Sequence, residues 1–150
     1  MVFTAILRDV GIEERSKNEL EHALSLLRAT LDATEDGIIS VDTSNRITSM
    51  NRKYIEMWRL PESGASEKDL GPLIKHLLSK VKDPESIHGT VKHLAECPQK
   101  PIHEFIELRD GRVFEHSSNP QMIGNEIVGI VCTFRDVTDE RHLVEELNEN

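Results

Sequence analysis

Histidine and cysteine are the residue types of this chain that could support metal or nucleophilic chemistry, and their spacing favours neither. The sequence holds seven histidines and two cysteines. His88 and His93 lie five residues apart on an expected helix, so their side chains point about 140° apart and cannot chelate one ion. Cys97 and Cys132 lack the short spacing of a zinc or redox pair. Because nucleophile, P-loop and glycine-rich nucleotide motifs are also absent, the sequence predicts no catalytic site.

The composition indicates one domain that binds no nucleic acid. At 150 residues the chain can bury a single hydrophobic core. Its net charge of -9 opposes contact with phosphate backbones, which require clustered Lys and Arg. No apolar run reaches the ~18 residues of a membrane span, and residues 1–10 lack the features of a signal peptide. Two unpaired cysteines fit a reducing compartment, so we expect a cytoplasmic protein without membrane contact.

A row of leucines predicts a long helix near the N-terminus. Its members recur at intervals of four, three and four residues, which is the spacing of a heptad stripe, and they are Leu20, Leu24, Leu27 and Leu31. The stripe either forms a parallel homodimer or docks on the chain's own domain.

The rest of the chain predicts an α+β domain. Short β-branched runs at 37–42 and 46–50 flank an expected hairpin turn. Residues 102–135 alternate with a period of two around two turns that contain Gly. The segment between these strands carries helical periodicity, and a charged helix begins at residue 139. Three antiparallel strands after a helical middle, with two strands before it, indicate an α+β fold.

The two ends of the chain carry nearly the same sequence. RDVGIEERSKNEL (8–20) and RDVTDERHLVEEL (135–147) match at six aligned positions with an offset of 127 residues. An offset of this size corresponds to one small domain plus a linker. We therefore interpret the chain as part of a tandem array, with the last strand of a preceding repeat at 1–10, a linker and dimerisation helix at 11–33, the domain at 34–136 and an exit helix at 137–150.

The order of the expected elements and the amino-acid sequence of three segments together resemble the PAS family. Residues 27–62 are similar to the opening of bacterial PAS domains, 107–120 to their third and fourth strands, and 128–147 to their last strand and D-[IV]-T exit helix. The resemblance implies a five-stranded antiparallel sheet in the order 2-1-5-4-3, with helices over one face and flanking helices at both ends. Ser44-Asn45 departs from the pattern, since many members carry Gly before the second strand.

The resemblance implies a non-enzymatic sensory or relay module of a multidomain signalling protein such as a histidine kinase. In the family, the cavity between sheet and helices holds haem, flavin, a small metabolite or nothing, and the flanking helices dimerise and pass strain to adjacent PAS and output domains. A ligand-free dimerisation domain is the main alternative, and a haem-based gas sensor is a minor one. Flavin photochemistry is not expected, because the N-C-R-F-like motif of the light-sensing branch is missing.

A ligand pocket is expected where the apolar helix faces meet the inner side of the sheet. Apolar concavities with few polar groups are typical ligand sites. We expect this one to be lined by Trp58, Leu77, Ile87, Val91 and Phe105. Sheet parity alone leaves open which face of its strand Phe105 occupies.

A signalling junction is expected where the last strand meets the exit helix. Asp136 and Thr138 lie there, and Asp9 lies at the matching place in the earlier copy. Their side chains can cap the helix, so a shift of the strand would reach it. A plain helix cap without a signalling role is the alternative.

We expect the histidines of the helical region and those of the strands to lie in different environments. Haem-binding relatives take their axial ligand from the helical region that contains His76, His88 and His93, although neither of the last two lies cleanly on the expected apolar face. His103 and His116 lie on paired strands and are expected to be solvated or at the rim of the sheet.

Overall fold

The chain folds into two compact units, Met1–Thr34 and Glu35–Asn150. The computed structural model describes the backbone of residues 2–61 and 69–149 and the side chains of residues 13–30, 33–61 and 69–148. The first unit is the helix α1 (Val2–Ala33). The second holds, in chain order, β1 (Gly37–Asp42), β2 (Ile47–Met50), α2 (Arg52–Met57), α4 (Leu70–Lys80), α5 (Pro84–Glu96), β3 (Ile102–Glu107), β4 (Val113–Ile123), β5 (Glu126–Asp136) and α6 (Thr138–Glu149).

The five strands form one antiparallel sheet in the order β2-β1-β5-β4-β3, which confirms the expected topology. β5 is central and pairs with β1 and β4, whereas β3 lies at an edge and pairs with β4 alone. The three hairpin turns contain residues in the left-handed backbone region, Asn45 (φ 62°), Gly111 (φ 97°) and Gly124 (φ 61°). Asn and Gly tolerate this conformation better than other residues, so the turns lie where the sequence predicts them.

Asn51 ties the start of α2 to the sheet. Its Oδ1 accepts hydrogen bonds from the backbone N–H of Tyr54 (3.0 Å) and of Ile38 (2.8 Å), and its Nδ2 donates to the carbonyl of Asp36 (2.9 Å). The side chain thus caps α2 and at the same time satisfies backbone groups beside β1. Asn51 is buried, so these bonds are shielded from water.

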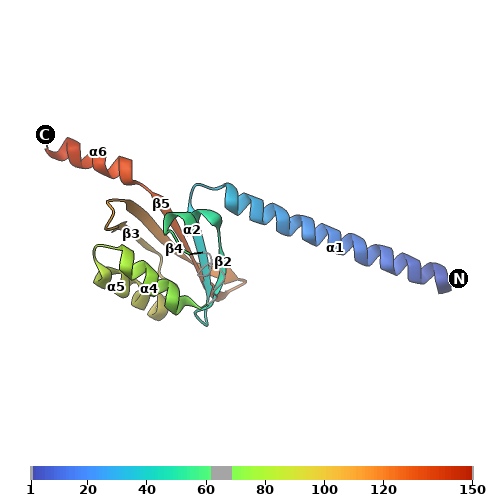
Figure 1. Cartoon of the computed structure of the whole chain (residues 1–150). Helices are drawn as coiled ribbons and strands as arrows, with labels where there is room; N and C mark the ends of the chain where they lie inside the picture. Colours follow the sequence, from blue (N-terminus) through green and yellow to red (C-terminus); the bar gives the residue numbers. More distant parts are fainter. Residues whose placement is uncertain (1, 62–68, 150) are drawn as a thin grey trace. The chain divides into compact units, whose positions relative to one another are not determined.

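An aromatic cluster at the end of α2 forms the centre of the core. Trp58 contacts Phe114 edge-on with ring centroids 5.1 Å apart, and it contacts Phe134 in the same way at 5.7 Å. Tyr54 adds an edge contact to Phe134 at 5.4 Å. Such pairs stabilise beyond the area that they bury. α2, α4 and α5 lie over the same face of the sheet, and α4 and α5 lie side by side (Figure 1).

The expectation of a strand over residues 1–10 is wrong, because Val2–Val10 belong to α1. A strand needs a neighbouring strand to satisfy its N–H and C=O groups, and a helix satisfies them within itself. None of the strand pairs of the described sheet includes these residues. A preceding repeat stays a prediction, and the side chain of Asp9 lies outside the described residues.

Gly129 in β5 provides a test of how closely the central strands pack. A Cβ at this position would overlap the carbonyl oxygen of Val41 in β1, whereas a Cβ at Gly89 on α5 would meet nothing within 4 Å. We expect Gly129→Ala to lower the free energy of unfolding by about 1–3 kcal/mol through overpacking. The control Gly89→Ala should raise it by up to about 1 kcal/mol, because Ala favours the helix. Urea denaturation measures both, and an undiminished stability of Gly129→Ala would contradict the packing.

Candidate functional site

A cavity of about 430 Å³ lies between the inner face of the sheet and helices α4 and α5. Its volume falls within the range of small-molecule pockets. Most of its lining is apolar and comes from Ile39, Val41, Leu70, Leu73, Ile74, Leu77, Ile87, Val91, Leu94, Ile106, Ile130 and Phe134. The strands position these side chains because alternate residues of a strand face the same side, and the helices position theirs through apolar stripes.

Four of the five residues predicted for the pocket line this cavity. They are Trp58 at the end of α2, Leu77 on α4, and Ile87 and Val91 on α5. Phe105 is the exception, and its inclusion is wrong, because it is 44% exposed and does not belong to the lining.

The reason for the exception is the parity of β3. Glu104 and Ile106 of this strand line the cavity, so Phe105 between them points to the opposite face. Sheet parity left the face of Phe105 open, and the structure shows that it is the outer one. The strand instead turns a carboxylate inward.

Glu104 forms a polar corner in the cavity together with His116 and Thr90. Its Oε1 lies 3.0 Å from Nδ1 of His116 on β4. The hydroxyl of Thr90 on α5 donates to Oε2 at 2.9 Å. His116 is only 3% exposed, and its ring stacks on Phe134 with centroids 4.5 Å apart. Three elements therefore converge on one carboxylate.

The Glu104 carboxyl is ionised at neutral pH. Burial raises its pKa, but the hydrogen bonds from His116 and Thr90 outweigh burial, so the pKa lies below its ordinary value. An ionised carboxylate can only accept hydrogen bonds, so Nδ1 of His116 carries the proton that joins the pair. The corner is a negatively charged acceptor site in apolar surroundings.

The expectation that His116 is solvated or at the rim of the sheet is wrong, because its side chain is buried in the lining of the cavity, and a signal for this place exists in the sequence. In the β3–β4 hairpin, Glu107 pairs with Val113 across the Asp110-Gly111 turn, and counting outward from there pairs Glu104 with His116. Directly opposed residues of an antiparallel pair share a face of the sheet. The other strand histidine, His103, is exposed as expected.

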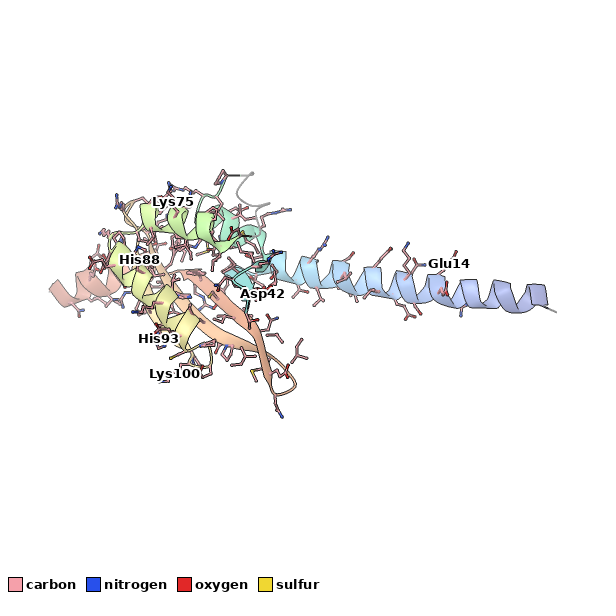
Figure 2. All side chains as sticks on the ribbon, turned by 90° about the horizontal axis from the view of Figure 1, so that it is seen from below. Glu14, Asp42, Lys75, His88, His93 and Lys100 are labelled. Atoms are coloured by element: carbon pink, nitrogen blue, oxygen red, sulfur yellow. The ribbon has the colours of Figure 1, made fainter. Side chains whose placement is uncertain are left out.

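None of the three candidate haem ligands lines the cavity. His88 and His93 are both on α5, where Figure 2 labels them, and His88 is exposed. Nε2 of His76 lies 3.0 Å from the carbonyl oxygen of Trp58 and is engaged there. An axial haem ligand from this helical region is therefore not at hand in the cavity.

Two further features of the lining bear on its chemistry. Cys132 lines the cavity, and burial together with the charge of Glu104 raises the pKa of its thiol to about 12, so it is no nucleophile at neutral pH. Trp58 Nε1 and His116 Nε2 are buried without a hydrogen-bond partner among the described residues. Such unpaired groups are rare in native proteins, and both belong to residues that line the cavity.

The predicted junction joins β4, β5 and α6. Asp136 Oδ1 accepts hydrogen bonds from the backbone N–H of Thr138 (3.0 Å) and from its hydroxyl. The Thr138 hydroxyl oxygen in turn accepts from the backbone N–H of Val113 at 3.0 Å. The N–H of Val137 donates to the carbonyl of Val113 at 2.9 Å. The two side chains thus hold the first turn of α6 to the start of β4 as well as to the end of β5.

Phe105 has a contact of its own on the outer face of β3. The guanidinium of Arg141 on α6 lies over its ring, 4.3 Å from the centroid. This cation–π contact attaches the exit helix to the same strand that supplies Glu104 and Ile106 to the cavity. Sequence reasoning missed this role, because it depends on the placement of α6.

Glu104→Gln tests the electrostatics of the polar corner. Because the pKa of Glu104 is depressed in the folded state, its charge stabilises the fold above the unfolded-state pKa and loses this effect as the pH falls through the folded-state pKa. We expect the variant to be about 1–2 kcal/mol less stable than the parent at pH 7. The difference should shrink below about pH 4. Urea denaturation of the parent and the variant from pH 7 to below pH 4 measures this difference in the free energy of unfolding. A difference that does not vary with pH would contradict an ionised carboxylate at the polar corner.

Comparison with known proteins adds a sequence match and a set of similar folds. Residues 31–145 match the family described as PAS fold. A probable C4-dicarboxylate sensor kinase of Halalkalibacterium halodurans is 28% identical over 130 residues, which are 87% of this chain and 22% of that protein. The chain thus spans less than a quarter of the length of this curated relative.

Two solved structures share the fold at low identity. The PAS domain of Bordetella pertussis BvgS gives a TM-score of 0.59 at 18% identity, covering 85% of this chain and 96% of that one. The PAS domain of an HTR-like protein from Haloarcula marismortui gives 0.54 at 17%, covering 82% and 98%. Since the family match over 31–145 contains all five strands and the helices that enclose the cavity, this chain belongs to the PAS family.

Proposed function

We propose that this chain is a non-enzymatic sensory module of a larger signalling protein, such as a histidine kinase. It binds a small molecule in its cavity and passes the binding state to α6. One observation carries the proposal. On β3, Glu104 and Ile106 line the cavity, and Phe105 between them contacts Arg141 of the exit helix.

The position of β3 in the sheet supports a mobile role. Because β3 is an edge strand, β4 is the one strand that it pairs with in the described sheet, and on its other side the N–H of Lys82 holds the carbonyl of Glu107 at the end of the strand (3.0 Å). Elements with few partners open and shift at lower cost than central ones. A ligand that draws Glu104 or Ile106 inward would tilt the strand, and Phe105 would transmit the tilt to the first turns of α6.

The junction of Asp136 and Thr138 provides a second connection. It fixes α6 to the start of β4, the strand that also carries His116. Movement of β4 or β5 would therefore reach α6 through the hydrogen bonds of Asp136 and Thr138. Contacts of this kind commonly pass a small shift to a neighbouring element.

The family and the curated relative support the place of the module in a larger protein. That relative is named a probable sensor kinase, and the matched part is a minor share of its length. We propose that this chain likewise controls an output domain elsewhere in its protein, and that catalysis belongs to that domain.

The second candidate function is dimerisation, and the exposure of α1 favours it. Leu20, Leu24 and Leu27 are 61%, 48% and 61% exposed in the single chain. The side chain of Leu31 lies outside the described residues. Exposed leucines at heptad spacing are buried most simply against a second copy of the same helix. Dimerisation and ligand sensing are compatible, because they use different units of the chain.

Asp136→Ala tests the junction. Loss of the carboxylate should cost about 1 kcal/mol of capping, which corresponds to roughly fivefold faster hydrogen exchange of the amides in the first turn of α6. In a full-length kinase that carries this module, the variant should bind stimulus as before but lose the coupled change in autophosphorylation.

The matched control is Asp139→Ala, which removes an exposed carboxylate from the same helical turn. It should exchange and signal like the parent. If Asp136→Ala responds to stimulus as the parent does, the junction is structural only and the relay must be abandoned.

Charged substitutions on α1 test dimerisation. We expect the parent chain to be dimeric by light scattering at tens of micromolar, and Leu24→Glu with Leu27→Glu to give a monomer, because buried like charges oppose helix pairing. Asn18→Glu with Ser25→Glu places two charges on the opposite side of the helix and should leave the dimer intact. A monomeric parent would refute the proposal.

A further inference from the structure

The acidic side chains in the lining of the cavity are three in number among the described residues. Asp42, Asp69 and Glu104 all belong to the lining, and the lining residues that the structure describes include no lysine or arginine. The site is therefore electronegative, apart from the imidazole of His116. This bears on the class of small molecule that the proposed sensor site takes.

The two aspartates already have structural partners. Asp42 Oδ1 accepts from the backbone N–H of Ser44 (2.9 Å) and of Arg46 (3.0 Å) in the β1–β2 turn. Asp69 caps α4 by accepting from the N–H of Gly71 at 3.4 Å. Local backbone structure thus accounts for both side chains, and their charges only add to the field in the cavity.

Glu104 differs from the two aspartates, because its carboxylate neither caps a helix nor stabilises a turn. It lies in the middle of β3, where an apolar residue would serve the core at lower desolvation cost. Its two oxygens hold His116 and Thr90, and a carboxylate has further lone pairs with which to accept. A donor group of a ligand would complete this site.

The N–H of His116 that faces the corner is not free for a bound anion. Its Nδ1–H is committed to Glu104, and its Nε2 is buried without a partner. A ligand carboxylate near this corner would meet Glu104 as a like charge, and charges interact more strongly in apolar surroundings than in water. An ammonium group would meet an opposite charge and an acceptor.

We infer that the cavity binds a small organic cation, with an ammonium group that donates to Glu104 and an apolar body that lies against α5 and β3, and that it discriminates against carboxylates. This inference rests on the proposed sensor function. The apolar lining of Ile87, Val91, Leu94 and Ile106 suits the body, and the polar corner suits the head.

Trp58 supplies the readout, because it is the single tryptophan of the chain and lines the cavity. Hexylamine, hexanol, hexanoate and succinate are titrated into the unmodified protein at pH 7 and constant ionic strength, with Trp58 emission as the signal. Hexylamine is an ammonium ion at this pH. It should bind at least about tenfold more tightly than hexanoate, with hexanol between them and succinate weakest.

Two variants assign the preference to the proposed residue. Glu104→Gln should remove most of the preference for hexylamine over hexanoate. Glu107→Gln loses the same charge from the same strand, but its side chain is exposed, and it should retain the parent's preference. The ligand comparison on the unmodified protein stands even if Glu104→Gln folds poorly, which circular dichroism would reveal.

The outcomes separate the two proposals. Hexanoate or succinate binding as tightly as hexylamine would overturn the ligand class and leave a ligand-binding sensor in place. An equal loss of preference in Glu107→Gln would overturn the assignment to Glu104. No response to any of the four probes would overturn the ligand class and the ligand-binding function together.

Discussion

The alternation of side chains along β3 is the constraint on which the proposed function depends. A strand turns every second residue to the same face. In β3 this rule sends Glu104 and Ile106 into the cavity and Phe105 out to Arg141 of α6. A shift of Glu104 or Ile106 in the cavity would therefore also move Phe105 on the opposite face of the strand. Because it lies at the edge of the sheet, this movement breaks few backbone hydrogen bonds.

A partly buried carboxylate, 22% exposed, is a costly choice for such a strand. Replacing buried ionic groups by apolar ones of similar volume is often neutral or stabilising, so Glu104 is not explained by stability. His116 and Thr90 offset its desolvation, and both come from elements that border the cavity. Glu104 thus places a hydrogen-bond acceptor in the lining of the cavity, and this placement supports the proposed recognition site.

Local sequence signals and the family resemblance together predicted the fold. Asn45, Gly111 and Gly124 have the backbone freedom that their turns require, and Asn51 and Asp83 cap the helices that follow them. With the turns known, the antiparallel pairings and the sheet order follow from the family resemblance. The three pocket residues on α4 and α5, Leu77, Ile87 and Val91, were predictable because an apolar stripe identifies a buried helix face.

Global features were harder to predict. Sheet parity left open which face of β3 carries Phe105, and the hairpin register that pairs Glu104 with His116 was not used to decide it. A strand was expected over residues 1–10 because an apolar, strand-like run precedes the repeated segment there, as β5 precedes its second copy, yet strand formation depends on a partner that no local pattern contains. The contact of Arg141 with Phe105 depends on where α6 leaves the sheet, and no spacing in the sequence encodes that.

Hydrogen exchange of α6 with hexylamine in the cavity tests the central claim most directly. The account predicts that saturating ligand changes the exchange of the α6 amides in the parent chain. In Phe105→Ala, Trp58 emission should still report binding, but the change in α6 should be lost or strongly reduced, because the link through β3 is cut. Binding reported by Trp58 without any change in α6 of the parent chain would contradict the account.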